Sequence, residues 1–206
     1  MPYPEIYLVR HGETEWNVAR RFQGQFDSRL TAKGEQQAAA VGRQMKEIFA
    51  ERGEMPFYCS PLGRCRQTAG FICEETRFDP AAIVHDDLLM EIHCGHWETY
   101  TRDEAEEKWP EERAQRRADF WNYAIPGGGE SGQMLLDRGR KWLDALPATS
   151  PMLAVAHGMI GMMIRGTYLG IEREKMIELG APQGVIMHLK DGEETLIECG
   201  VAIGGR

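Results

Sequence analysis

The residues best suited to chemistry follow a short apolar run near the start of the sequence. Residues 6–9 (Ile-Tyr-Leu-Val) lead directly into Arg10, His11 and Gly12. A buried strand that ends in polar residues delivers them to the carboxyl edge of a sheet, where ligands bind in open α/β folds. Arg10 offers a planar fork for a phosphate or carboxylate, and a neutral His11 offers a nucleophilic ring nitrogen. Gly12 predicts a tight turn that brings the backbone close to a ligand.

The same pattern, a strand-like run followed by His-Gly, occurs a second time. Residues 152–156 are continuously apolar and lead into His157 and Gly158. Two strands of one sheet can place both histidines at the same edge, and a helix that opens at His157 offers free N–H groups to an anion. One histidine can then attack phosphorus while the other, protonated, holds a non-bridging oxygen. The alternative is a pair of core histidines, but the repetition favours the functional interpretation.

A strand–helix junction in the middle of the chain adds arginines to this edge. Residues 57–59 predict a short strand and residues 62–76 predict a helix, so Arg64 and Arg66 follow the strand closely. Each is a candidate phosphate-binding group, and the alternative is a solvated helix charge.

A phosphoryl-transfer site also needs a group that protonates the leaving oxygen. Residues 88–92 set Glu91 among apolar neighbours, and burial keeps a carboxyl group protonated near neutral pH. We therefore predict Glu91 as the proton donor, with a glutamate at the pocket rim as the alternative. Glu13 is the second candidate acid, and we expect it to orient other groups instead.

Several segments resemble, in this order, the signatures of the histidine phosphatase superfamily, which has the phosphoglycerate mutase-like fold. Residues 10–14 match Arg-His-Gly-Glu/Gln-Thr, residues 60–69 match Ser-x-Leu-x-Arg-x-x-Gln-Thr-Ala, and residues 89–98 match Leu-x-Glu-x-x-x-Gly-x-Trp-Glu. The resemblance implies that Arg64 is a second phosphate-binding arginine and supports Glu91 as the acid. It leaves Arg66 as a solvated helix charge.

The predicted site follows from these segments taken together. Two arginines and a protonated imidazole can neutralise the charge of a phosphoryl group in flight, so neither a metal nor a cofactor is required. The predicted catalytic residues are His11, Glu91, His157, Arg10 and Arg64. The resemblance implies phosphate or substrate contacts for Arg10, Asn17, Gln23, Gly24, Arg64, His157 and Gly158, with Arg21 a weaker candidate.

Three residues depart from the family pattern. Arg20 and Thr99 stand where glycine is common, and Arg29 stands where proline is common. These departures alter loops around the mouth of the site, so they affect the inference about substrate more than the chemistry.

A histidine pair near the predicted acid raises the question of a metal site. His93 and His96 flank Cys94, but this spacing is too close for a good zinc chelate of three side chains. We expect both histidines to line the pocket or to lie on the surface.

The alternation of strands and helices predicts a three-layer α/β/α sandwich with a mostly parallel sheet. We predict one domain over residues 1–206 with a helical insertion at about 101–123. Ser131, in the Gly-Glu-Ser segment 129–131, is the expected N-cap of a helix. The predicted helices cover 34–52, 62–76, 101–121, 131–146 and 159–170, and the predicted strands cover 6–9, 57–59, 82–85, 152–156, 184–189 and 195–199.

Composition limits the classes of partner. The chain has 206 residues, of which 42% are hydrophobic and 27% charged, which is typical of a globular domain. The net charge of −8 argues against nucleic acid and anionic membranes as partners. Five cysteines without a tight pairing pattern and no signal-peptide pattern predict a cytoplasmic protein. A small phosphorylated substrate is the expected partner, and a homodimer is left open.

The length of the insertion separates branches of the family. Cofactor-dependent phosphoglycerate mutases are longer chains with a longer insertion after the acid glutamate, so the resemblance favours a phosphatase that acts through a phosphohistidine. A mutase is the first alternative. A non-catalytic phospho-ligand or protein-binding module is the second, although the key histidines and arginines are all present.

Overall fold

A six-stranded sheet forms the centre of the computed structural model, which describes residues 3–147 and 150–204. The strand order is β3-β2-β4-β1-β5-β6. The first four strands of this order are parallel, β5 runs antiparallel to β1, and β6 runs antiparallel to β5. The strands are β1 Ile6–Arg10, β2 Phe57–Cys59, β3 Val84–His85, β4 Met152–Ala156, β5 Val185–Lys190 and β6 Glu193–Glu198.

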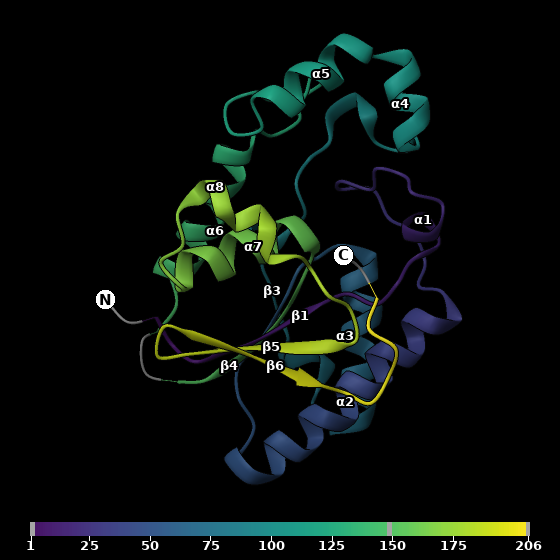
Figure 1. The fold of residues 1–206 in the computed structure, drawn as a ribbon. Coiled ribbons are helices and arrows are strands. Elements are labelled where there is room, and N and C mark those ends of the chain that lie inside the picture. Colours follow the sequence, from purple (N-terminus) through teal and green to yellow (C-terminus); the bar gives the residue numbers. More distant parts are fainter. Residues whose placement is uncertain (1–2, 148–149, 205–206) are drawn as a thin grey trace.

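Helices cover both faces of this sheet (Figure 1). Helices α2 and α3 pack on one face, and α6 and α7 pack on the other. The predicted three-layer sandwich with a mostly parallel sheet is therefore confirmed. The helices are α1 Glu15–Val18, α2 Ala32–Arg52, α3 Gly63–Thr76, α4 Arg102–Lys108, α5 Pro110–Ala118, α6 Gly132–Asp144, α7 Gly158–Tyr168 and α8 Arg173–Met176.

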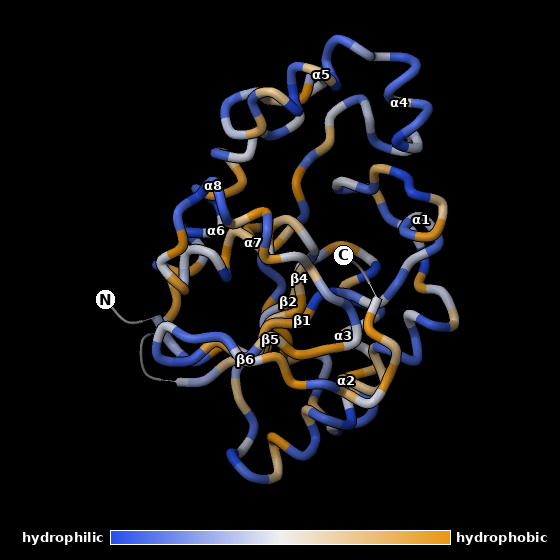
Figure 2. The backbone as a smooth tube through the Cα atoms, viewed as in Figure 1, coloured by the Kyte–Doolittle hydropathy of each residue, from blue (hydrophilic) through white to orange (hydrophobic). Residues whose placement is uncertain are grey.

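The central strand β1 explains why the sequence there is continuously apolar. Ile6 and Leu8 pack into the cluster under α6 and α7, whereas Tyr7 and Val9 pack into the cluster under α2 and α3. Because successive side chains of a strand point to opposite faces, a strand covered on both sides must be apolar at every position. The hydrophobic segments accordingly gather at the sheet and on the inner sides of the helices (Figure 2).

Caps set the boundaries of the principal helices close to the predicted ones. The Thr31 side chain accepts the Gly34 N–H at the start of α2, and Gly53 ends that helix at a φ of 83°. Ser131 accepts the Met134 N–H at 3.2 Å, which confirms its predicted N-cap role on α6.

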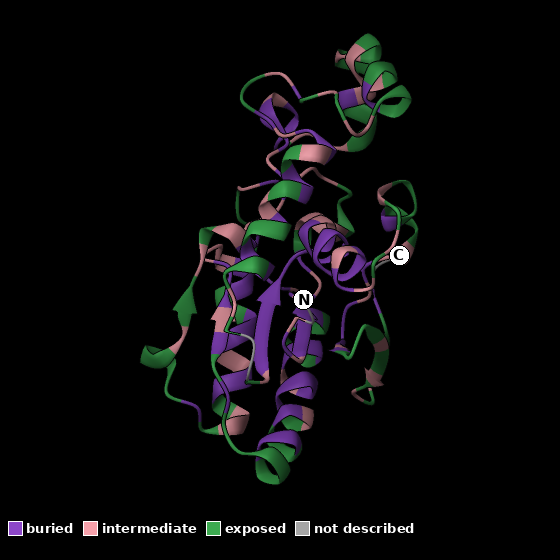
Figure 3. Ribbon diagram, turned by 90° about the vertical axis from the view of Figure 1, so that its left-hand side faces the viewer, coloured by how far each residue is buried: buried purple, intermediate pink, exposed green. Residues whose placement is uncertain are grey.

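The insertion is helical, as predicted for 101–121, and it consists of two helices. Pro110 cannot continue a helix, so α4 ends before Trp109 and α5 begins at Pro110. Both helices stand away from the sheet and are mostly exposed (Figures 1 and 3). The predicted strand 82–85 is also shorter, because residues 80–82 form a 3₁₀ turn. The 3₁₀ turns are η1 Pro80–Ala82, η2 Asp87–Leu89, η3 Gly95–Trp97 and η4 Ile177–Leu179.

Membrane insertion has no support from the helices. Within residues 3–147 and 150–204, none combines the length and the apolar character that crossing a bilayer requires.

Candidate active site

The two predicted histidines lie beside each other at the carboxyl edge of the sheet. Strands β1 and β4 are parallel neighbours with Arg10 opposite Ala156. The His11 N–H donates to the Ala156 carbonyl at 3.0 Å, which extends the pairing one residue beyond the strand. The ring centroids of His11 and His157 are 5.2 Å apart. The prediction that the two strands bring these histidines together is confirmed.

His11 is in the form that a nucleophile needs. Its Nδ1 lies 2.8 Å from the Gly12 carbonyl oxygen, which can only accept a hydrogen bond, so Nδ1 carries the proton. The Nε2 lone pair is therefore free, and His11 lines the pocket. Burial, with the charges of Arg64 and Arg10, lowers the pKa of His11 well below 6.5. The imidazole is consequently neutral at physiological pH.

His157 differs from the prediction in its charge. Its Nδ1 accepts the Arg64 Nε–H at 3.0 Å, and its Nε2 lies 2.7 Å from the Ser60 hydroxyl. Burial, followed by the charges of Arg64, His11 and Arg10, lowers the pKa of His157 well below 6.5. The expected protonated imidazole is thus corrected to a neutral one whose two nitrogens both have partners.

Arg64 joins several parts of the site. Its guanidinium is almost fully buried and, besides His157, donates to the carbonyls of Gly24 at 2.7 Å and Phe26 at 2.6 Å. It also meets the carboxylate of Asp27 at 3.4 Å. Arg64 therefore fixes the loop 24–27 against the end of β4 and contributes positive charge to the pocket.

Arg10 retains an unused donor. Its Nε is buried without a hydrogen-bond partner among the described residues, and its Nη1 donates to the Ala181 carbonyl at 2.5 Å. Burial is the main cause that lowers the pKa of Arg10. A buried guanidinium N–H without a partner indicates a site for an anionic oxygen, because leaving it unpaired costs free energy.

The N-terminus of α7 is not open to an anion in the way we predicted. The carboxylate of Glu91 accepts the N–H groups of Met159 at 3.1 Å and Ile160 at 3.2 Å. It also accepts the N–H of Ile92 at 2.9 Å. These three N–H donors fix the direction of the Glu91 carboxyl group. Gly158 supplies the helix N–H that remains available on the pocket side, within the part of the chain described.

A pocket of about 520 Å³ connects these groups to the insertion. Asn17, Gln23 and Gly24 line it as predicted, and so does Arg21, which pairs with Glu104. His157 lies behind this lining. The outer wall from α4 and α5 supplies Arg102, Arg113, Arg116 and Arg117, and aromatic walls come from Phe22, Trp97 and Phe120.

The geometry agrees with the comparison with known families. The model of the histidine phosphatase superfamily (branch 1) matches residues 6–198. The chain belongs to this superfamily.

Relatives within the superfamily carry different names. The protein named "Probable phosphoglycerate mutase GpmB" from Escherichia coli O1:K1 is 42% identical over 173 residues, covering 81% of this chain and 75% of that protein. Its namesake from Serratia proteamaculans is 40% identical with the same coverage.

Two solved structures of similar fold are phosphatases by name. The mycobacterial glucosyl-3-phosphoglycerate phosphatase, solved with VO3, has a TM-score of 0.74, 26% identity, and coverage of 98% of both chains. The alpha-ribazole phosphatase from Shigella flexneri has a TM-score of 0.79 at 22% identity, covering 98% of this chain and 99% of that one, which shows the shared fold.

The superfamily signature glycine Gly12 has a different role from the one predicted. A Cβ at Gly12 would overlap with the backbone of Gly34 at the start of α2. The close approach that requires glycine is therefore made by a helix, and Gly12 does not line the pocket. Glu13, as expected, orients this helix start, because its carboxylate meets Thr31 at 3.0 Å and Lys33 at 3.1 Å.

The histidines of the suspected metal segment have local partners. His96 stacks on Trp109 with centroids 4.4 Å apart and lies 2.8 Å from the Glu112 carboxylate. His93 Nδ1 accepts the Gly95 N–H at 2.9 Å. Both are half-buried outside the pocket lining, and across the described ranges no group of three or more His, Cys, Asp or Glu side chains could hold a metal ion.

Two polar residues that the sequence did not single out help to build the site. Ser60, fully buried, is the partner of His157 Nε2. Glu98, also buried, accepts the N–H groups of Gln25 at 2.9 Å and Cys94 at 3.0 Å. A Cβ at Gly24, whose φ is 51°, would overlap with the Glu98 carboxylate. The only sequence signal for these roles is their position inside the superfamily segments.

Two departures from the superfamily pattern coincide with strained backbone. Arg20 has a φ of 56° and Thr99 a φ of 74°, in the left-handed region that favours glycine. The two loops pair with each other, since the Thr99 N–H donates to the Phe22 carbonyl at 2.9 Å. A glycine at either position would adopt this backbone conformation without strain.

Proposed function

We propose that this protein is a metal-independent phosphomonoesterase that acts on small phosphorylated metabolites through a phosphohistidine. The observation that carries the proposal is the neutral His11, whose free Nε2 lies in the same pocket as the unpaired Nε of Arg10. A nucleophile and an empty anion-binding donor in one pocket fit a phosphoryl group between them.

In the first step of the proposed reaction, His11 Nε2 forms a bond to phosphorus as the bond to the ester oxygen breaks. Arg10, Arg64 and the Gly158 N–H hold the non-bridging oxygens and stabilise their charge. Glu91 gives its proton to the leaving oxygen. Water returns a proton to Glu91 in the second step, so the acid is restored in each turnover.

In the second step, water attacks phosphorus and the bond to His11 Nε2 breaks. The water proton passes to the Glu91 carboxylate, which returns to its α7 cap. Inorganic phosphate leaves the pocket, and His11 is neutral again.

The substrate class follows from the outer wall of the pocket. Arg113 lies 4.8 Å above the Trp97 ring and 4.9 Å from the Phe22 ring, so its guanidinium is fixed at the wall. Arg102 and Arg116 have no carboxylate partner among the described ion pairs. This positive wall on an acidic protein favours small anionic substrates over neutral ones.

The test is hydrolysis of p-nitrophenyl phosphate with EDTA present, together with trapping of an acid-labile phosphohistidine. The wild type should turn over, and His11→Ala should lose on the order of 10³-fold or more in kcat. Arg66→Ala, an exposed arginine on α3, is the control that should keep wild-type activity. Absence of wild-type turnover, or full activity in His11→Ala, would refute the proposal.

Mutase activity is the second candidate, because the 42% identical relative is named a probable phosphoglycerate mutase. A mutase must return the phosphoryl group to a bound substrate before water reaches it. Conversion of 3-phosphoglycerate that depends on 2,3-bisphosphoglycerate would identify it, whereas release of inorganic phosphate identifies the phosphatase. A binding module without catalysis would form no phosphohistidine.

A further inference from the structure

The acid loop, residues 88–93, is held by a half-buried ion pair that lies outside the pocket lining. Arg138 on α6 forms a bidentate pair with Glu130, with Nε–Oε1 at 3.0 Å and Nη2–Oε2 at 2.8 Å. The two side chains are only 15% and 14% exposed. Glu130 belongs to the Gly-Glu-Ser segment 129–131. Ser131 of this segment caps α6, but no role has yet been given to Glu130.

The remaining donors of Arg138 all reach the backbone of the acid loop. Its Nη1 donates to the carbonyls of Leu88 at 3.0 Å and Met90 at 2.5 Å, and its Nη2 donates to the Glu91 carbonyl at 3.1 Å. A guanidinium has five N–H donors, and these five hydrogen bonds use all of them. The Arg138 guanidinium therefore bridges Glu130 to three carbonyls of the acid loop.

Glu130 holds the other end of the same loop. Its carboxylate accepts the His93 N–H at 2.8 Å, and its own N–H donates to the His93 carbonyl at 2.9 Å. The ion pair therefore fixes backbone groups on both sides of Glu91.

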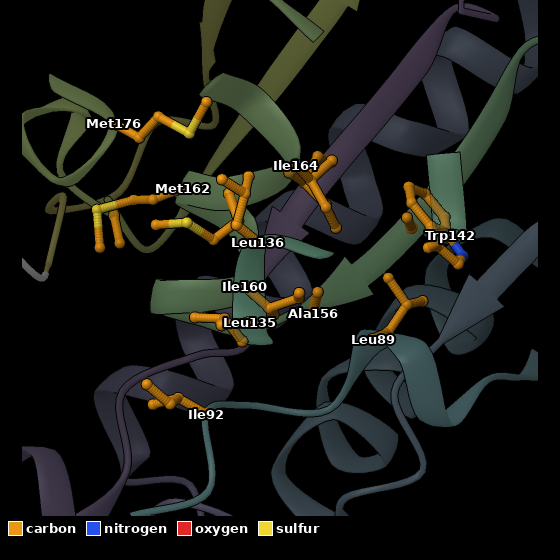
Figure 4. Close-up of a cluster of buried hydrophobic side chains, with 14 of the residues drawn as sticks. Leu89, Ile92, Leu135, Leu136, Trp142, Ala156, Ile160, Met162, Ile164 and Met176 are labelled. Atoms are coloured by element: carbon orange, nitrogen blue, oxygen red, sulfur yellow. The ribbon is translucent and has the colours of Figure 1, made fainter. Parts of the chain in front are cut away.

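Apolar packing alone would leave the direction of the Glu91 side chain open. Leu89 and Ile92 are buried in the cluster between α6, α7 and the sheet, on either side of the acid (Figure 4). These two buried side chains fix how far the loop lies from the sheet. The orientation of the peptide planes between them depends on what binds the carbonyl groups of those peptides. Arg138 binds those carbonyls, and Glu91 then reaches the first turn of α7.

We propose that Arg138 and Glu130 are positioning residues that aim the proton donor Glu91 at the leaving oxygen. This inference rests on the proposed phosphatase reaction. A positioning role for the acid predicts a loss that depends on the leaving group. An alkoxide needs a proton as it departs, whereas p-nitrophenolate leaves with little assistance.

The experiment compares kcat/KM for glycerol 1-phosphate and p-nitrophenyl phosphate in wild type, Arg138→Gln and Glu130→Gln. Both variants should lose roughly 10²-fold on the alkyl ester, the cost typical of a misplaced catalytic group, and much less on the aryl ester. Arg140→Gln, an exposed arginine on the same helix, is the matched control and should leave both values unchanged.

A double variant separates positioning from general damage to the fold. In a Glu91→Gln background the donor is already absent, so Arg138→Gln should add no further loss on the alkyl ester. Equal losses on both esters, or an additive loss in that background, would overturn the proposal.

Hydrogen exchange tests the structural half without any activity. The amides of residues 89–93 should exchange faster in Arg138→Gln than in wild type and in Arg140→Gln. Unchanged exchange would overturn the proposal that Arg138 holds this loop. Wild-type turnover of the two esters tests the phosphatase reaction separately. If the glutamine variants fail to fold, Arg138→Lys, which keeps the charge and loses the planar fork, provides the same comparison.

Discussion

The two buried histidines make the stability of this protein depend on pH in a window that the structure defines. Burial and the nearby arginines lower the pKa of both His11 and His157 well below 6.5. In the unfolded chain each imidazole takes up a proton as the pH falls below about 6.5. The unfolded state then binds more protons than the folded state, so stability is full above this pH and is lost below it.

The size of this loss follows from proton linkage. Between pH 7.5 and pH 5.5, protonation of one histidine in the unfolded state alone costs about 1.4 kcal/mol of folding stability. The two histidines together should cost about 2.7 kcal/mol. These figures are the upper values, reached when both imidazoles stay neutral in the fold over this range.

The assay is urea unfolding at the two pH values for wild type, His11→Asn, His157→Asn and the double variant. The amide of asparagine can replace the Nδ1 hydrogen bond of either ring. Each single variant should remove about half of the loss of folding stability that the two histidines cause between the two pH values. The double variant should remove nearly all of it. His85→Asn, at an exposed position on β3, is the control and should change nothing. If the free energy of unfolding depended on pH equally in wild type and the double variant, the conclusion that both imidazoles are neutral in the fold would be refuted.

Two further predictions concern the frame of the site. Thr99→Gly should stabilise the protein by about 1 kcal/mol, because Thr99 holds a φ of 74° that glycine adopts without strain; an unchanged urea midpoint would show that this loop carries no strain. Ser60→Ala should cost about 1–3 kcal/mol in thermal unfolding, because it leaves the buried His157 Nε2–H with only the weak acceptor Cys65 Sγ at 3.4 Å. A Ser60→Ala protein as stable as wild type would contradict that tautomer.

Most of the fold could be predicted because its signals are local. The apolar run before Arg10 and the capping serine at the start of α6 depend on residues that are neighbours in sequence. The helical insertion was predicted, but its division into two helices at Pro110 was not, because Trp109 and Phe120 continue an apolar pattern across the proline. The short helices α1 and α8, each of four residues, carry no periodic signal.

The residue types of the site could also be predicted from the sequence, but the protonation state of His157 could not. His157 was expected to be charged, and the α7 N-terminus was expected to be open. The structure instead gives His157 two partners and fills the helix end with the Glu91 carboxylate. A protonation state depends on burial and on charges from distant segments, which spacing along the chain does not encode.

The sequence by itself determined which groups are available: two histidines after two buried strands, two arginines, and a glutamate among apolar residues. Only the tertiary structure decided which nitrogen of His11 is free, which donor of Arg10 is unused, and that Arg138 and Glu130 hold the acid loop. The physical reason is that a side chain's chemistry follows from its hydrogen-bond partners and its burial. The Ala181 carbonyl lies 171 residues from Arg10, the two partners of His157 lie 93 and 97 residues away, and the Glu91 carbonyl lies 47 residues from Arg138.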